Sequence, residues 1–266
     1  MKRFLCCFCG LLVATVSLRA TPLFSDSFTY PDGNLVGQGP WLQNGTSATT
    51  PVQVLTGRAM LGSSGQDVNA ALSSPFSLVD GTSFYIGATI NLSAAQAAGD
   101  YFLHWSPATS STIFLSRVEA RSSGTGFQLG YVETSGTGAS LTWGTTVLNF
   151  NQNYRMVLAY NVVAGPVNDT ADLYVNPTDR IVQGNNTPYL SDTWNSVTAE
   201  TATLGAINLR QGTAANAPTL SIDELGVTTT FAEAATFTPA PVPEPTSLSL
   251  LGGFGLLAWY INRRRR

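Results

Sequence analysis

The sequence has little of three residue types that globular proteins commonly use for covalent links, metal sites and surface charge: cysteine, histidine and lysine. The three cysteines, Cys6, Cys7 and Cys9, fall within the first ten of 266 residues, which excludes disulfide bonds and cysteine-based zinc sites from the rest. The one histidine, His104, cannot by itself build a His-rich metal site. No partner for it in a Ser-His-Asp triad is identifiable either.

Charged residues are also scarce, at 11% of the chain, and they are unevenly distributed. Three of the 13 Lys and Arg lie in the first 19 residues and four close the chain, so that six, all arginine, lie between. Residues 21–242 hold 15 of the 16 Asp and Glu, and the net charge of this segment is −9. An acidic body argues against nucleic acid as a partner and against recruitment of the body to an anionic membrane surface.

The first 20 residues have the three parts of a secretory signal. Lys2 and Arg3 precede an apolar stretch at 4–16, and Ala20 offers a small residue at a plausible cleavage site, with Ser17 as the alternative. The sequence therefore predicts a signal peptide at 1–20. The remaining body of about 210 residues can bury a full two-sheet core, so its stability does not require disulfides.

The last 32 residues form a second targeting segment. Prolines at 239, 241, 243 and 245 favour an extended spacer, which we place at 235–245. The hydrophobic run that follows is short for a membrane span, but Trp259 and Tyr260 suit the membrane interface and the arginines suit a cytoplasmic stop. We therefore predict a single transmembrane helix at 246–262 and a basic cytoplasmic tail comprising Arg263, Arg264, Arg265 and Arg266.

This terminus resembles the PEP-CTERM sorting signal of exopolysaccharide-producing Gram-negative bacteria. The matching features are Pro243, Glu244 and Pro245, a Gly-rich apolar span and the basic tail, in that order. The resemblance implies recognition by an exosortase, a membrane protease that processes the segment near the motif. The protein would then be anchored in the inner membrane by its helix before release to the cell surface or extracellular matrix. A plain C-terminal anchor with a proline-rich stalk is the alternative.

Residues 21–234 have the pattern of one all-β domain. Alternation is clearest at 83–92, where Phe84, Ile86 and Ile90 share one face, and 154–163 is apolar on both faces, as in a central strand. Further strands are expected at 113–121, 127–133, 171–175, 203–210 and 220–229. Only 93–99 has helix-favouring composition, for two turns at most. Strands without intervening helices predict an antiparallel sandwich or jelly roll.

Three loose motifs in this domain resemble the concanavalin A-like, laminin G-like passengers found upstream of PEP-CTERM signals. They are the opening segment 23–28, the pair 154–158 and 172–177, and the closing segment 220–227. The resemblance implies a concanavalin A-like jelly-roll β-sandwich whose first and last strands pair, so that 24–28 should lie beside 222–228. It also suggests a calcium site near the paired termini, for which Asp26 and Asp223 are the candidate ligands. No other cofactor is expected.

The sequence contains no recognisable catalytic constellation. Retaining β-glucanases of the concanavalin A-like class carry two carboxylates at alternate positions of one strand, and no such triplet occurs here. Asp223 and Glu224 are adjacent and would point to opposite faces of a strand. Arg117, Glu119 and Arg121 share one face, which we interpret as a solvated row of opposite charges. No nucleophile elbow, phosphate loop or dinucleotide fingerprint is present, so no catalytic residue is predicted.

Carbohydrate binding is the activity that the resemblance favours, because concanavalin A-like folds bind glycans on a concave sheet through aromatic stacking. The candidates are Trp105, Trp143 and Trp194, with Tyr85 and Tyr174, although each is also a natural core residue. The sequence thus predicts an exported, non-enzymatic surface or matrix protein that binds polysaccharide. A glycan hydrolase or lyase of the same fold and a purely structural matrix component remain open alternatives.

Overall fold

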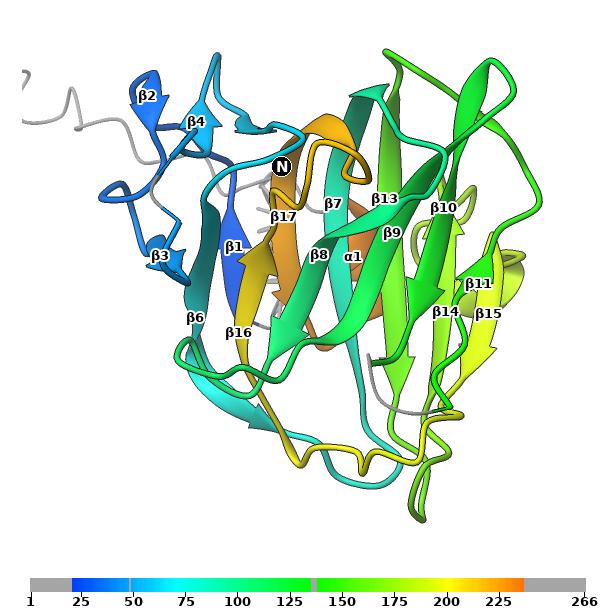
Figure 1. The fold of residues 1–266 in the computed structure, drawn as a ribbon. Helices are drawn as coiled ribbons and strands as arrows, with labels where there is room; N and C mark the ends of the chain where they lie inside the picture. The colour runs from blue at the N-terminus through cyan, green and yellow to red at the C-terminus, as the bar shows by residue number, and fades with distance from the viewer. Residues whose placement is uncertain (1–20, 48, 135–137, 237–266) are drawn as a thin grey trace, which may run out of the picture.

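The computed structural model describes residues 21–47, 49–134 and 138–236 (Figure 1). Four predicted features lie outside these residues: the signal peptide at 1–20, most of the linker with Pro243, Glu244 and Pro245, the membrane helix at 246–262, and the tail from Arg263 to Arg266. Within the described ranges, no helix is long and apolar enough to cross a membrane. The structure therefore concerns the body between the two predicted signals.

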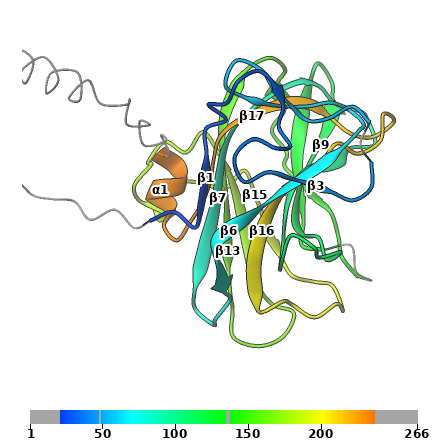
Figure 2. The ribbon, with the colours of Figure 1, turned by 90° about the vertical axis from the view of Figure 1, so that its left-hand side faces the viewer.

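Two antiparallel sheets face each other and form a sandwich (Figures 1 and 2). Sheet A has nine strands among the described residues, with β1 (Phe24–Asp26) paired to β17 beside the main path. Its path runs β15 (Leu190–Thr193), β14 (Thr170–Val175), β13 (Asn153–Asn161), β7 (Ser83–Ala94), β17 (Thr219–Thr228), β5 (Ala59–Leu61), β4 (Gln53–Val54) and β2 (Gly33–Asn34).

Sheet B has eight strands in the same part of the chain, with β12 (Leu148–Asn149) paired to β10 beside the path. Its path runs β11 (Thr142–Trp143), β10 (Gly126–Val132), β9 (Leu115–Ser123), β8 (Asp100–Ser106), β16 (Thr203–Leu209), β6 (Asp67–Ser77) and β3 (Leu42–Asn44). Two short helices complete the fold, the 3₁₀ turn η1 (Gln183–Asn185) and α1 (Phe231–Thr236). The predicted all-β fold, a sandwich of two antiparallel sheets, is confirmed.

The core lies between the sheets and follows the predicted alternation. Phe84, Ile86 and Ile90 of β7 are all fully buried, because every second side chain of the strand points toward sheet B. The apolar segment at 154–163 becomes β13, which pairs with both β7 and β14 and is therefore the central strand that the sequence predicts. The sandwich thus owes its stability to one continuous apolar layer.

The predicted pairing of the first and last strands is also confirmed. β1 runs antiparallel to β17, with Phe24 opposite Val227 and Asp26 opposite Leu225. This pairing closes the chain on itself, because β17 also pairs with β7 and β5 in the middle of sheet A. The termini of the described body consequently lie near each other at one face of the sandwich (Figure 2).

The outer face of sheet A is partly covered by α1, as the side view shows (Figure 2). Phe231 and Ala234 of α1 pack on the second apolar face of β13, where Val157 and Ala159 are fully buried. Close approach is possible because β7 has a glycine at the contact: a Cβ on Gly87 would lie 2.3 Å from the carbonyl oxygen of Ala234. Both faces of sheet A are therefore occupied in this region.

The expectation about helices was wrong. Residues 93–99 do not form a helix, because Ser93 and Ala94 extend β7 and Gly99 turns the chain with φ +75°. The helix that does form, α1, is only six residues long and has no periodic signal; its packing on sheet A stabilises it. This helix includes Ala235 and Thr236.

Candidate functional site

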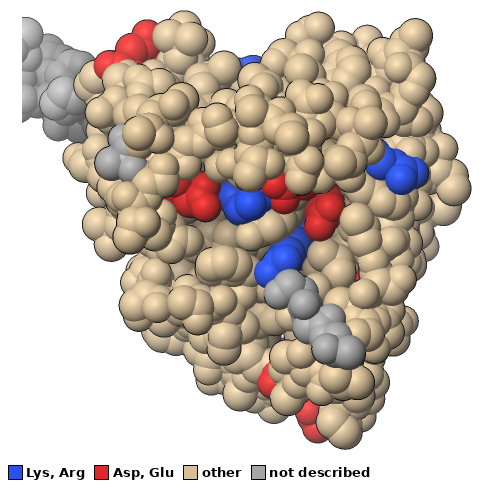
Figure 3. Space-filling view, viewed as in Figure 1, with Lys and Arg blue, Asp and Glu red and all other residues tan. Residues whose placement is uncertain are grey.

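The outer face of sheet B carries a hollow in which acidic and arginine side chains gather in a row (Figure 3). The strands of this sheet alternate between the core and this face. In β9, Val118 and Ala120 are fully buried against the core, so Arg117, Glu119 and Arg121 point outward together, as the sequence predicts. The residues of this face that are discussed below form the sheet B site: Asp67, Asp100, Tyr101, His104, Arg117, Glu119, Arg121, Trp143 and Arg210.

The centre of the sheet B site is a tyrosine in contact with two arginines. The guanidinium carbons of Arg210 and Arg117 lie 4.1 Å and 4.6 Å from the centre of the Tyr101 ring. Arg210 also donates to Asp100 across an ion pair of 2.7 Å and lies 4.0 Å from a carboxylate oxygen of Asp67. Three strands, β6, β8 and β9, and the residue directly after β16 thereby contribute to one polar surface.

A tryptophan lies at the far end of this surface. Trp143 of β11 is opposite Gly130 of β10, and a Cβ on Gly130 would lie 2.7 Å from the indole ring. Because Gly130 has no side chain, the Trp143 ring can pack directly against the backbone of β10. The guanidinium of Arg121 lies 4.3 Å from the indole centre, so the exposed part of this pair presents both an aromatic edge and a cation.

Several polar atoms of this face are buried without a hydrogen-bond partner in the described part of the chain. They are both ring nitrogens of His104, Oδ1 of Asn69 and Nε of Arg117. His104 and Asn69 are each only 1% exposed, which makes the unsatisfied atoms costly unless something else satisfies them. These atoms lie beneath the hollow. A hydroxyl-rich ligand, or a water that bridges to it, can supply the hydrogen bonds that they lack.

Burial sets the protonation of this face. The pKa of Glu119 is raised to about 7 by burial and by the neighbouring Asp100 carboxylate, against the opposing effect of Arg117 and Arg210. Burial likewise raises the pKa of Asp67 to about 6. The pKa of His104 is lowered to about 3 by burial and by the same two arginines, so its imidazole is neutral at ordinary pH.

Replacing Glu119 tests this electrostatic description. A carboxyl whose pKa rises on folding binds its proton more tightly in the folded state, so stability falls as pH rises from about 4.5 to about 7. Glu119→Gln removes this titration. At pH 8 the variant should therefore be more stable than the parent protein by on the order of 2 kcal/mol, while at pH 4 the two should be similar. Urea unfolding of both proteins across this range measures the difference.

Asp80→Asn is the control for that comparison, because Asp80 is an exposed carboxylate that is not part of the sheet B site. It leaves Glu119 in place, so the loss of stability between pH 4 and pH 8 should remain. The pKa of Asp67 is raised, like that of Glu119, and the pKa of His104 is lowered. Both groups should titrate in the same way in the parent and in the variant, so they do not affect the comparison. A Glu119→Gln protein that is less stable than its parent at pH 8 would contradict the raised pKa.

The predicted aromatic candidates separate into two groups. Trp143 reaches the outer face of sheet B, whereas Trp105 is 0% exposed and Trp194 only 3%, and both rings belong to the core between the sheets. Tyr85 and Tyr174 lie beneath α1, in edge contact with Phe231. The expectation of glycan stacking therefore does not fit Trp105 or Trp194, because both rings point into the core.

The two predicted calcium ligands do not form a site. Asp26 accepts hydrogen bonds from the Phe28 amide, the Tyr30 hydroxyl and the Trp41 indole at 2.6–2.8 Å, so its carboxylate is committed to the fold. Asp223 follows the core residue Ile222 and points away from the core, with Arg58 at 4.0 Å. Among the described residues, no group of three or more Asp, Glu, His or Cys is arranged to hold a metal ion. Asp26 and Asp223 therefore do not fit the predicted calcium site.

Sequence reasoning missed Asp67, Asp100, Tyr101 and Arg210. β8 was not predicted as a strand, and the four residues come from segments up to 143 positions apart, so no local motif connects them. The available signal was weak: Arg210 is the last residue of the strand predicted at 203–210, and Asp67 precedes the buried Val68. Arg117, Glu119 and Arg121 share a face as predicted, but they form part of a half-buried network rather than a solvated row.

Several solved structures are similar to the body at low sequence identity. The CBM2 module of the evolved Dit of Lactobacillus casei BL23 phage J-1 is 10% identical over 77% of this chain and 94% of that chain, with a TM-score of 0.49. A glycosyl hydrolase family protein from Mycobacterium fortuitum is 10% identical over 78% and 100%, with a TM-score of 0.47. The carbohydrate-binding module CBM66 from Bacillus subtilis is 14% identical over 71% and 95%, with a TM-score of 0.40.

The tail of the chain matches a known family model. No curated protein matches the chain. Residues 241–266 match the PEP-CTERM protein-sorting motif, which implies export, sorting to the cell surface and processing by an exosortase. The PEP-CTERM sorting signal predicted from Pro243, Glu244, Pro245 and the basic tail is thereby confirmed for these residues.

Proposed function

We propose that this protein is a non-enzymatic, polysaccharide-binding component of the bacterial cell surface or extracellular matrix. The sorting motif supports the destination. The observation that carries the binding function is the sheet B site: a hollow on the open sheet in which arginines, carboxylates and two aromatic rings converge above buried polar atoms that lack partners. Sugar hydroxyls both donate and accept hydrogen bonds, so they match such a mixed surface.

The extent of the site fits a chain-like ligand. From β11 to β6 the polar surface crosses five strand spacings, which is about 24 Å at about 4.8 Å per spacing. A ligand of that length has several sugar units. Sheet A offers no comparable open surface where α1 covers β7 and β13. The polysaccharide is therefore proposed to lie across the strands of sheet B.

A polysaccharide pull-down with the full chain, purified in detergent, tests this function. The parent protein should be retained by at least one neutral or acidic polysaccharide. Arg117→Ala and Trp143→Ala should each weaken retention at least about 10-fold, which corresponds to about 1.4 kcal/mol. Arg180→Ala, an exposed arginine outside the sheet B site, is the control and should bind normally. Equal retention of all four proteins would place the ligand elsewhere.

A glycan hydrolase is the second candidate, because the sheet B site brings carboxylates to one face. The pKa of Glu119 suits a proton donor near neutral pH, and Asp100 lies close enough to influence it. Against catalysis, the Asp100 carboxylate is held by Arg210 at 2.7 Å. An assay for new reducing ends decides between the two: release that Glu119→Gln abolishes would make the protein an enzyme, and no release from a retained polysaccharide supports binding alone.

The membrane stage of the proposal concerns residues outside the structure. The segment 246–262 is proposed to hold the exported protein in the inner membrane, with Arg263 to Arg266 on the cytoplasmic side, until an exosortase acts near Pro243, Glu244 and Pro245. The body then leaves for the surface or matrix. Its acidic charge and the hollowed outer face of sheet B are the properties that it takes there.

A further inference from the structure

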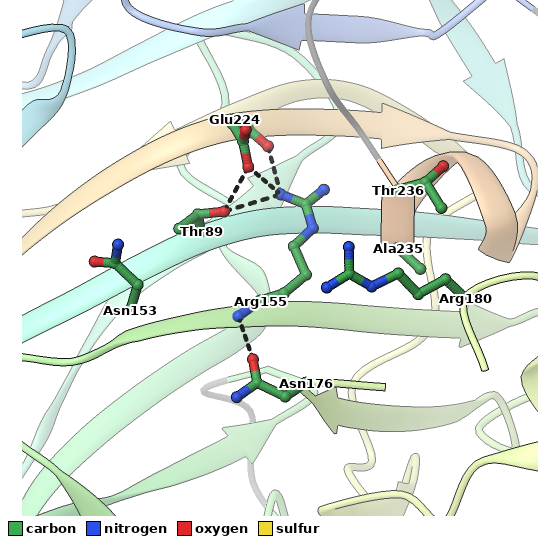
Figure 4. Close-up of a pocket in the computed structure, with 8 residues that line it drawn as sticks. All are labelled: Thr89, Asn153, Arg155, Asn176, Arg180, Glu224, Ala235 and Thr236. Carbon is green, nitrogen blue, oxygen red and sulfur yellow. Dashed lines mark hydrogen bonds and ion pairs between the residues drawn. The ribbon is translucent and has the colours of Figure 1, made fainter. Parts of the chain in front are cut away.

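A second cavity lies on the opposite side of the sandwich, where α1 meets sheet A (Figure 4). It has a volume of about 260 Å³ and is lined by polar side chains from β7, β13, β17 and the segment after β14, together with the end of α1. That volume is below the roughly 300 Å³ at which drug-sized sites begin, so it suits one small unit rather than a polymer. Nothing described for the sheet B site involves these residues.

One of the two arginines at this cavity is committed to the fold. Arg155 is 8% exposed, and its guanidinium donates to the carbonyl oxygens of Ala234 and Glu224. The carboxylate of Glu224 lies 3.8 Å from Arg155 and accepts a hydrogen bond of 2.7 Å from the Thr89 hydroxyl. A β-bulge between Asp223 and Gly226 places Glu224 at φ +49° and turns it toward Arg155.

Three further side chains at the cavity have donors without partners among the described residues. Arg180 is exposed, directs its guanidinium into the space beside Arg155 (Figure 4), and makes no hydrogen bond or ion pair within the described residues. The amide oxygens of Asn153 and Asn176 accept hydrogen bonds from Asn91 and from the Arg155 backbone, which leaves their NH₂ groups without partners in this part of the chain. All three of these residues line the cavity.

The charge of the cavity selects its ligand. Arg155 and Arg180 contribute two positive charges and Glu224 one negative charge, so one positive charge remains uncompensated at the cavity, within a strongly acidic body. We infer that this cavity is a second binding site, for the carboxylate and neighbouring hydroxyls of one sugar acid. Arg180 would pair with the carboxylate, and the two asparagine amides and Glu224 would hold the hydroxyls.

Binding of monosaccharides to the full chain in detergent, measured by calorimetry or ligand-observed NMR, tests this site. Glucuronate should bind at least about 10-fold more tightly than glucose, which lacks the charge, and than acetate, which lacks the ring. Arg180→Ala should weaken glucuronate binding at least about 10-fold, and Arg180→Lys should weaken it less. Because Arg180 is exposed and makes no contact that folding needs, both variants should keep the parent melting temperature.

Arg121→Ala, in the sheet B site on the other sheet, distinguishes this site from the proposed polysaccharide site. It should leave glucuronate binding unchanged, and Arg180→Ala should leave polysaccharide retention unchanged. The inference is overturned if glucuronate does not bind, if acetate binds as tightly as glucuronate, or if Arg121→Ala weakens glucuronate binding as much as Arg180→Ala does.

Discussion

Trp105→Ala is expected to lower the free energy of unfolding by about 3–5 kcal/mol and the melting temperature by about 6–20 °C. The Trp105 ring is 0% exposed and packs edge-on against Phe84 and Tyr160, with ring centres 5.6 Å and 5.7 Å apart. Removing it leaves a cavity in the middle of the sandwich that the two sheets cannot close. Urea and thermal unfolding of the full chain measure the loss.

Two further variants make this result specific. Trp105→Phe keeps most of the aromatic packing and removes the indole nitrogen, which has no hydrogen-bond partner among the described residues, so it should lose less than about 1.5 kcal/mol. Trp143→Ala should change stability by less than about 1 kcal/mol but weaken polysaccharide binding. A Trp105→Ala protein with parental stability and reduced binding would show that the ring faces a ligand and that its assignment to the core is wrong.

Arg155→Ala is expected to destabilise the protein by a similar amount, about 3–5 kcal/mol. Its guanidinium links α1 to sheet A, so truncation leaves the buried carbonyls of Ala234 and Glu224 without donors. Burial lowers the pKa of Arg155 to about 10, against the opposing effect of Glu224, so the group is still charged at neutral pH. Lysine cannot make these contacts together, and Arg155→Lys should recover little of the loss.

Arg180→Ala is the matched control for Arg155→Ala, because it removes a guanidinium from the same cavity without removing a contact. It should change the free energy of unfolding by no more than about 0.5 kcal/mol. Hydrogen exchange of the α1 amides gives a second readout: Arg155→Ala should increase exchange there first. If Arg155→Ala and Arg180→Ala have the same stability, the link between α1 and sheet A is not what holds the helix.

The fold was largely predictable because its strands follow simple alternation. The face of β7 with Phe84 and Ile86, the two apolar faces of β13 and the pairing of β1 with β17 all follow from the sequence pattern or from the family resemblance. The helix α1 was not predictable, since six residues carry no periodic signal and the helix depends on a long-range contact with Arg155. Local patterns cannot show such contacts.

The candidate site was predictable only in part. The shared face of Arg117, Glu119 and Arg121 follows from alternation, but the raised pKa of Glu119 depends on burial and on Asp100, which lies on another strand. Whether a tryptophan faces the core or the surface depends on the register of its strand, and Trp105 and Trp143 differ for that reason. The sorting motif was readable because all its parts are contiguous in the chain.

Hydrogen–deuterium exchange of the full chain, with and without a retained polysaccharide, shows whether the ligand lies on the outer face of sheet B. Added polysaccharide should slow exchange in β8, β9 and the residues after β16, and leave β7 and β13 of sheet A unchanged. Slower exchange confined to sheet A, or none in either sheet for a polysaccharide that is retained, would contradict the account.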